Sequence, residues 1–198
     1  MAAGLMHTEP ARLLASLRQV LEARGIATPA EIAERIRITD AATPAQGARM
    51  VARAWLDSDY LALMLRDGAA AAEALGIPMR GMPPLGVLEN APDLHHLVVC
   101  TLCSCYPRAV LGYPPNWYKS AAYRARAIRD PAGVLAEFST ILPPATRIRV
   151  LDSTADYRWM VLPERPAGTD NWSEPALAAI VREGDMIGVT RPKADAPP

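Results

Sequence analysis

The sequence predicts an α+β fold, with an N-terminal helical arm followed by a layered α/β globule. Helix-start signals recur through the first part of the chain, up to about residue 80. Residues 76–86 are then rich in glycine and proline, which is typical of a linker or an irregular loop. Short β-like segments alternate with short helical segments after that stretch. We therefore expect residues 1–80 to form a helical arm or cover that contacts a partner, and residues 81–198 to form a mixed α+β domain.

The arm carries the signatures of four helices. Thr8 is placed to cap the first, whose apolar residues recur at helical spacing before Gly25: Leu13, Leu14, Leu17, Val20 and Leu21. The stretches "TPAE" from Thr28 and "TPAQ" from Thr43 each combine a cap residue, a proline at the first helical position and a capping-box partner. A fourth helix is expected from Ser58 to about Leu75.

The second part is expected to hold four strands and short helices. The strands are predicted by β-like runs at these positions: Gly86–Asn90, Leu94–Cys100, Thr146–Asp152 and Tyr157–Pro163. Two helices are predicted to begin after the cap residues Asp130 and Ser173. Many prolines lie between these elements, so this part is expected to be rich in rigid loops.

The charge balance argues against two classes of partner. Lys plus Arg (21) equals Asp plus Glu (21), so no overall field attracts nucleic acid or an anionic membrane. The sequence has no apolar run of about 18 residues, so no transmembrane helix is expected. Its start lacks the charged and apolar segments of a secretory signal, and we expect a cytoplasmic protein. In that reducing compartment, clustered cysteines more often bind metal or do redox chemistry than form disulfides.

All three cysteines, Cys100, Cys103 and Cys105, lie within six positions on a loop that is expected after a strand. A single buried cysteine behaves as a small hydrophobe, but three at this spacing favour a chemical role. A structural zinc site needs four ligands. His95 and His96 are adjacent on the strand and point to opposite faces, so at most one of them could complete it. An iron–sulfur cluster also takes four cysteines, and a redox pair of the first two would leave Cys105 unexplained.

The backbone can complete the ligand set. The peptide nitrogens of Ser104 and Cys105 lie between Cys103 and Cys105, and once deprotonated they can encircle one metal together with the two sulfur atoms. Cys100 can then supply an axial thiolate and leave a sixth position open. Two anionic amides require a strongly polarising ion, which favours a trivalent metal over zinc or magnesium. Catalysis takes place at an open position on a Lewis acid, so residues 81–198 are expected to be a metal-binding catalytic domain.

Several motifs together resemble the α subunit of nitrile hydratase and the related γ subunit of thiocyanate hydrolase. They are "VCTLCSC", "LGYPPNWYKSAAYRAR", "IRVLDSTADYRWMVLPERPAGTDNWSE" and "MIGV". The resemblance covers about Thr43 to Val189, and its cysteine motif is highly specific. On these residues the chain is identified as a member of that family.

The resemblance implies a cobalt or iron site held by the ligands described above. In the family, threonine after the first cysteine, here Thr101, goes with cobalt, so Co(III) is expected and Fe(III) is the second choice. Cys103 is expected as cysteine sulfinic acid and Cys105 as cysteine sulfenic acid, because a metal-bound thiolate is readily oxidised. The implied partners are a β-type subunit, whose arginines bind the two oxidised cysteines, and an activator protein that loads the metal.

The implied reaction is the hydration of a small-molecule nitrile to an amide at Cys103, Ser104 and Cys105. The nucleophile is either the oxygen of the Cys105 sulfenate or a water that it activates. The Ser104 hydroxyl is expected to hydrogen-bond within the pocket. The resemblance therefore predicts a lyase that works as part of a heteromer.

Outside the cysteine loop, Asp152, Asp156 and Arg158 align with an acidic–acidic–arginine set that supports the site and the subunit contact in the family. An exposed salt bridge at a strand edge is the alternative for these residues. Asp156 is one methylene shorter than the glutamate that the family pattern predicts. For Trp117 and Tyr118, which also match the family, we expect core packing or a subunit interface.

Two departures from the family pattern concern the substrate. Arg108 stands where nitrile hydratases usually carry a pocket tryptophan and where thiocyanate hydrolases carry arginine. Gly81 replaces an expected glutamine nineteen residues before Cys100, which removes a hydrogen-bond donor and enlarges the pocket. A polar or heteroaromatic, nucleoside-like nitrile is therefore expected. The alternatives are a γ-type subunit of thiocyanate hydrolase and a non-catalytic cobalt-binding or redox protein.

Overall fold

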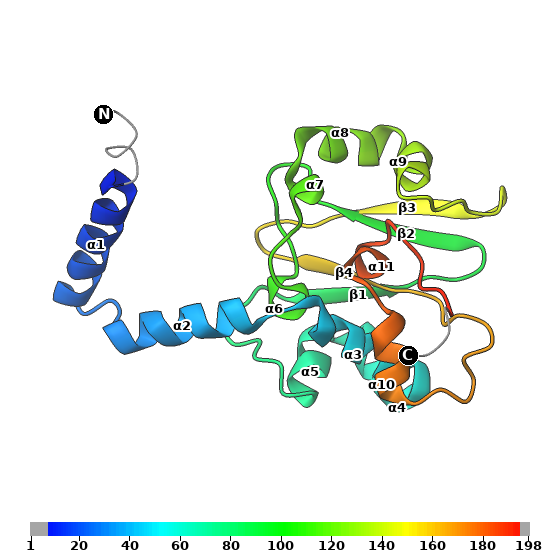
Figure 1. Ribbon diagram of the computed structural model, residues 1–198, viewed down its shortest axis with the longest axis horizontal. Helices are drawn as coiled ribbons and strands as arrows, with labels where there is room; N and C mark the ends of the chain where they lie inside the picture. The colour runs from blue at the N-terminus through cyan, green and yellow to red at the C-terminus, as the bar shows by residue number, and fades with distance from the viewer. Residues whose placement is uncertain (1–7, 195–198) are drawn as a thin grey trace. The chain divides into compact units, whose positions relative to one another are not determined.

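The computed structural model describes residues 8–194 and divides into two compact units, with the boundary between Ala41 and Ala42 (Figure 1). Three helices after residue 42 pack into the core of the second unit: α3 (Pro44–Leu56), α4 (Ser58–Arg66) and α5 (Gly68–Ala74). The division of function that the sequence predicts near residue 80 stays a prediction. Contact of the first eighty residues with a partner stays a prediction.

The first unit consists, within residues 8–41, of the helices α1 (Thr8–Ala23) and α2 (Pro29–Ala41). The predicted capping box at the start of α2 is present. The backbone N–H of Thr28 donates to the Glu31 carboxylate (2.8 Å), and the backbone N–H of Glu31 donates to the Thr28 hydroxyl oxygen (3.2 Å). Gly25 follows α1 with a φ of +64°, the left-handed conformation that suits glycine. Four apolar residues of α1 are exposed: Leu13, Leu14, Leu17 and Val20.

One helix was expected from Ser58 to about Leu75, but the structure has two. The side chain of Asp57 caps α4, and the side chain of Asp67 interrupts the helical segment by accepting from the backbone N–H of Ala70 at 2.9 Å. An aspartate cap starts a new helix because its carboxylate satisfies backbone N–H groups that have no partner in a first turn.

Four strands lie within residues 8–194 and pair in parallel as two-stranded sheets (Figure 1): β1 (Leu85–Glu89) with β4 (Arg158–Leu162), and β2 (Leu94–Val99) with β3 (Arg147–Asp152). The four predicted strands are therefore confirmed. In the second pair Val99 is in register with Asp152. Because the carboxyl ends of parallel strands meet at one edge, Asp152 lies beside the start of the cysteine loop.

Short helices surround the strands: α6 (Arg108–Leu111), α7 (Asn116–Lys119), α8 (Ala121–Arg129), α9 (Pro131–Glu137), α10 (Glu174–Ile180) and α11 (Glu183–Ile187). The sequence predicted α9 and α10 with their caps, and the other four were missed. Such short helices are stabilised mainly by tertiary packing, which a sequence pattern does not display. Helices α8 and α9 contact β2 and β3, whereas α4 and α5 contact β1 (Figure 1). Among the described residues, no helix combines the length and the apolar character that a membrane span requires.

The adjacent histidines of β2 are core residues and do not point at the cysteines. The ring Nδ1 of His95 lies 3.2 Å from the Asn90 amide nitrogen, and its Nε2 lies 2.7 Å from the Gly188 carbonyl oxygen. The backbone N–H of His96 donates to the Asn90 amide oxygen at 2.8 Å. Since Nδ1 accepts from Asn90, Nε2 carries the proton and donates to Gly188. His95 is therefore engaged on both ring nitrogens as a neutral side chain.

The two histidines are expected to make the stability of the chain depend on pH. Burial lowers the pKa of His95 and of His96 from the ordinary value of 6.5. The unfolded chain then binds more protons than the folded chain below about pH 6.5, so the free energy of unfolding falls as the pH drops through that value. Denaturant unfolding across this pH range measures the effect, and His95→Gln is expected to flatten the slope. An equal slope in wild type and variant would contradict it.

Candidate metal centre

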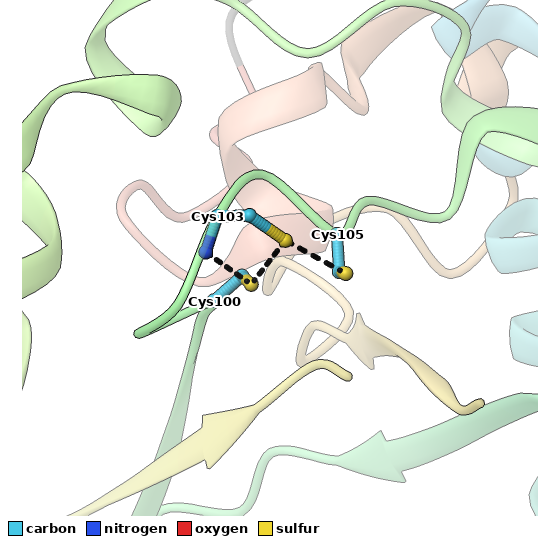
Figure 2. Close-up of side chains that lie close together, drawn as sticks. All are labelled: Cys100, Cys103 and Cys105. Atoms are coloured by element: carbon cyan, nitrogen blue, oxygen red, sulfur yellow. Dashed lines mark hydrogen bonds between the residues drawn. The ribbon is translucent and has the colours of Figure 1, made fainter. Parts of the chain in front are cut away.

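The cysteine loop, residues 100–105, leaves the end of β2 and brings its three sulfur atoms together (Figure 2). All three Sγ atoms lie within 4.8 Å of one another. Cys103 is central, with its Sγ 3.5 Å from that of Cys100 and 3.3 Å from that of Cys105. Cys100 and Cys105 are buried, whereas Cys103 is exposed. The cluster is therefore closed on the protein side and open on the side of Cys103.

Hydrogen bonds inside the loop favour negative charge on the central sulfur. The thiols of Cys105 and Cys100 and the backbone N–H groups of Ser104 and Cys105 hydrogen-bond to the Cys103 sulfur and lower its pKa. Burial, followed by the bond to Cys103, raises the pKa of Cys105. Between these two cysteines, negative charge is therefore favoured on Cys103. The amide groups of Ser104 and Cys105 lie close enough to this sulfur to affect its pKa, and their role as metal ligands stays a prediction.

Asp152 holds the start of the cysteine loop. Its carboxylate accepts from the backbone N–H of Thr101 (3.0 Å) and from the Thr101 hydroxyl (2.6 Å). These two bonds tie the residue after Cys100 to the end of β3. Asp152 thus lies next to the loop, and its role in supporting a metal site stays a prediction.

Asp152→Asn is expected to weaken metal retention by about 10- to 100-fold, the usual cost of losing a partner of a ligand-bearing segment. Asparagine can keep both contacts only by donating its NH2 group to the Thr101 hydroxyl oxygen, and both bonds lose the charge of the carboxylate that makes them strong. Metal content after dialysis against a chelator measures the effect. Asp93→Asn is the matched control, because Asp93 forms an exposed ion pair with Arg147 at the other end of the same strands (3.3 Å). Equal losses in both variants would contradict the role of Asp152.

Three side chains from α7 and α8 also hydrogen-bond to this loop and to the end of β2 that precedes it. The hydroxyl of Tyr118 donates to the Cys105 carbonyl oxygen at 2.8 Å. The hydroxyl of Tyr123 donates to the carbonyl oxygen of Val98, in β2, at 2.6 Å. Arg124 Nη1 donates to a loop carbonyl, that of Leu102, at 2.9 Å.

Sequence reasoning missed these contacts, although the stretch "NWYKSAAYR" contains all three side chains. The expectation of core packing for Trp117 and Tyr118 was correct, but it did not include the contact of the Tyr118 hydroxyl with the loop. The Trp117 ring stands edge-on to Tyr123 at 5.0 Å and to Phe138 at 4.9 Å, measured between ring centroids. The aromatic cluster therefore fixes the tyrosines whose hydroxyls reach the loop and its preceding strand.

The other two members of the predicted acidic–acidic–arginine set lie differently. Arg158 begins β4 and is half-buried, and its charge opposes the rise in the pKa of Cys105 that burial causes. Its Nη1 is buried and has no hydrogen-bond partner among the described residues. Asp156 is exposed between β3 and β4, where its backbone N–H donates to the Thr154 hydroxyl oxygen at 3.3 Å. The structure shows no contact between the Asp156 carboxylate and the cysteines, and its role in the site stays a prediction.

Arg108 lies at the start of α6, and its guanidinium carbon is 4.1 Å from the centroid of the Tyr113 ring. Arg108 and Arg158 line a cavity of about 90 Å³ whose other walls are mostly apolar: Met79, Met82, Pro83, Leu85, Tyr106, Pro107, Ala109 and Val110. Gly81 lies between two of these residues with a φ of +72°. A larger cavity of about 790 Å³ is lined only by residues from 138 to 193, and it contains no residue of the cysteine loop. Neither cavity is lined by a residue of the cysteine loop, but the small one is lined by Tyr106 and Pro107, which directly follow Cys105.

Comparisons with known proteins agree with this geometry. The family described as "Nitrile hydratase, alpha chain" matches residues 8–190. The low-molecular weight cobalt-containing nitrile hydratase subunit alpha of Rhodococcus rhodochrous is 51% identical over 149 residues, which span 75% of this chain and 72% of that one. Thiocyanate hydrolase subunit gamma of Thiobacillus thioparus is 48% identical over 161 residues, 76% of this chain and 66% of that one.

A solved structure gives the same picture. An iron-type nitrile hydratase from Comamonas testosteroni Ni1, carrying two histidine substitutions, superposes with a TM-score of 0.82 at 37% identity. The superposition covers 98% of this chain and 94% of that one. The match at this coverage extends over both the helical N-terminal part and the unit that holds the cysteine loop.

Proposed function

This chain belongs to the nitrile hydratase alpha-chain family, and from that premise we propose that it is the metal-binding catalytic subunit of a nitrile hydratase. Such an enzyme adds water to a nitrile and gives the corresponding amide. The observation that carries the proposal is the cluster of three sulfur atoms within 4.8 Å of one another, on a loop inside the matched residues. The high coverage of relatives that are named nitrile hydratase alpha subunits supports the same activity.

The donor set fits a small, strongly polarising metal ion. Three sulfur atoms converge, and the amides of Ser104 and Cys105 face the central one. We propose that Cys100, Cys103 and Cys105, with the two amide nitrogens, hold one Co(III). Relatives named as cobalt-containing support cobalt, and Fe(III) is the alternative because an iron-type structure also superposes. When bound, the metal supplies a Lewis acid that polarises the nitrile.

The burial of the cysteines supports different oxidation states for two of them. Cys103 is exposed and its pKa is lowered, so its thiolate meets dioxygen readily, whereas Cys105 is buried. We propose that Cys103 takes up both atoms of one dioxygen molecule and becomes a sulfinate. Cys105 takes one oxygen from hydrogen peroxide, which leaves as water, and becomes a sulfenate.

We propose different roles in the reaction for Cys105, Ser104 and Arg158. The sulfenate oxygen of Cys105 either attacks the nitrile carbon itself or accepts a proton from the water that attacks. Ser104 is exposed beside the sulfur atoms, so its hydroxyl can donate a hydrogen bond to that water or to the substrate. The arginine Arg158 offers an unpaired, buried N–H close enough to Cys105 to affect its pKa.

Two surfaces of the chain support a heteromeric enzyme. Cys103 and Ser104 are exposed, so the open side of the cluster needs a cover that excludes bulk water and binds the oxygen atoms. The apolar residues of α1 are exposed as well. We propose that a β-type subunit covers the cluster and supplies arginines to the oxidised cysteines, and that an activator protein loads the metal.

The small cavity beside Tyr106 supports a polar substrate. Its walls are apolar except for Arg108 and Arg158, so a group that enters it meets two cations. A polar or heteroaromatic nitrile would place hydrogen-bond acceptors there, whereas a simple aliphatic nitrile would leave the buried Nη1 of Arg158 without a partner. Gly81, exposed between the lining residues Met79 and Met82, has no side chain that could fill this space.

Hydrolysis of thiocyanate is the second candidate, and Arg108 is the observation that favours it. A cation at the site attracts an anionic substrate, and the chain is 48% identical to a thiocyanate hydrolase subunit. An activity assay distinguishes these functions. The cobalt-loaded complex is supplied in turn with polar nitriles, aliphatic nitriles and thiocyanate. Amide from the polar nitriles is the expected result. Carbonyl sulfide and ammonia from thiocyanate would favour the alternative, and bound metal without any turnover would show a non-catalytic metal protein.

A further inference from the structure

A continuous line of hydrogen bonds connects α8 to the first cysteine of the loop. Arg124 Nη1 donates to the carbonyl oxygen of Leu102 at 2.9 Å. The same peptide group carries the backbone N–H of Cys103, which donates to the Cys100 Sγ at 3.3 Å. We propose that Arg124 is a positioning residue that orients and polarises this peptide group, and so sets the electron density on the Cys100 sulfur. The inference rests on the proposed function in one respect, namely that Cys100 is a metal ligand.

The physical basis is the rigidity and polarity of the peptide group. A peptide is planar, so a contact that fixes its C=O also fixes the direction of its N–H. A charged donor at the carbonyl oxygen polarises the group and makes the N–H of Cys103 a stronger donor. A stronger hydrogen bond to the Cys100 thiolate withdraws electron density from the sulfur and reduces its donation to a metal.

The surroundings of the loop indicate that this contact is what holds the peptide. The Leu102 side chain is 86% exposed and anchors nothing within the described residues. Arg124 is half-buried, and its Nε is buried with no hydrogen-bond partner in the part of the chain that the structure describes. Leaving such an N–H unpaired costs free energy. The Nε atom therefore does not hold the guanidinium in place. The hydrogen bond from Nη1 to the Leu102 carbonyl oxygen does.

The peptide between Cys100 and Thr101, two before the one that Arg124 contacts, is held by the opposite charge. Asp152 accepts from the N–H of Thr101, while Arg124 donates to the C=O of Leu102. The Asp152 carboxylate binds a backbone N–H, and the Arg124 guanidinium binds a backbone C=O. Together they fix the successive residues Thr101 and Leu102 in one orientation. Asp152 acts on the segment after Cys100, and Arg124 acts on the N–H that reaches the Cys100 sulfur.

Arg124→Met removes the donors and keeps an apolar stem of similar length, whereas Arg124→Lys keeps the charge and one donor group. Arg129→Met is the matched control, because Arg129 is an exposed arginine of the same helix. In the cobalt-loaded complex, Arg124→Met is expected to move the sulfur-to-metal charge-transfer absorption to longer wavelength. Because the peptide that bears the Cys103 N–H is then no longer held in one orientation, metal retention is also expected to fall by about tenfold, despite the stronger donation from the Cys100 sulfur. Arg124→Lys is expected to shift the absorption less in the same direction, and Arg129→Met to leave it unchanged.

A second measurement does not require metal. In the metal-free full-length chain, the amide proton of Cys103 is expected to exchange faster and to move upfield in Arg124→Met, because its hydrogen bond weakens. A Cys103 amide and a charge-transfer absorption that match wild type in both Arg124 variants would overturn the inference. If wild type binds no metal, the proposed function fails, and the Cys103 amide proton still decides the role of Arg124. If Arg124→Met does not fold, the same two readings on Arg124→Lys decide it.

Discussion

Cys105→Ala is expected to abolish amide formation by the complex while the chain stays folded. The substitution removes one of the three converging sulfur atoms, and with it the sulfenate oxygen that we propose for Cys105. The loss of activity is expected to exceed the ~100-fold that removal of an outer partner of a ligand costs, because a ligand itself is lost. The thiol behaves as a small hydrophobe in the fold, so the free energy of unfolding should fall by only about 1 kcal/mol.

The matched control is Leu102→Ala, a change in the same loop at a side chain that is almost fully exposed. This variant is expected to keep metal and activity. Amide formation, metal content and thermal unfolding, measured on both complexes, separate loss of chemistry from loss of fold. Turnover by Cys105→Ala within tenfold of wild type would remove Cys105 from the mechanism.

Gly188→Ala is expected to lower the free energy of unfolding by more than about 4 kcal/mol, a loss reserved for severe changes. Gly188 ends α11 with a φ of +84°. A Cβ there would overlap the backbone carbonyl oxygen of His96 in β2, and the Gly188 carbonyl itself accepts from His95 at 2.7 Å. Neither backbone can move aside without disturbing the strand that leads into the cysteine loop.

Gly168→Ala is the control for this prediction. Gly168 has a similar φ of +80°, but a Cβ at this position meets nothing within 4 Å. Its substitution should therefore cost only the left-handed conformation, about 1–2 kcal/mol. Denaturant unfolding of both variants measures the difference, and similar losses would show that the approach of Gly188 to β2 does not matter.

The chemistry of the cysteine loop could be predicted from sequence because it is local. Cys100, Cys103 and Cys105 lie within six positions, so chain connectivity alone brings their sulfur atoms close. The strand before the loop was predicted for the same reason, since residues 97–100 form an unbroken apolar run that includes two β-branched valines. The capping box at Thr28 and the cap at Asp130 are local patterns too, and both are present in the structure.

The rest depends on contacts between distant residues. The parallel pairing of β1 with β4 and of β2 with β3 joins segments more than fifty residues apart, and no local pattern encodes it. The roles of Tyr118 and Arg124 became visible only when α7 and α8 were placed beside the loop. The break at Asp67 was missed because strong helix formers on both sides hid a cap signal.

The most direct test of this account is the metal content of the purified complex, together with the intact mass of the peptide that carries residues 100–105. The chain is produced with its partner subunit, the activator and cobalt. We predict one cobalt per chain, with two oxygen atoms added at Cys103 and one at Cys105. Zinc or no metal, with three unmodified thiols and no amide formed, would contradict the assignment of the cysteine loop as a catalytic metal centre.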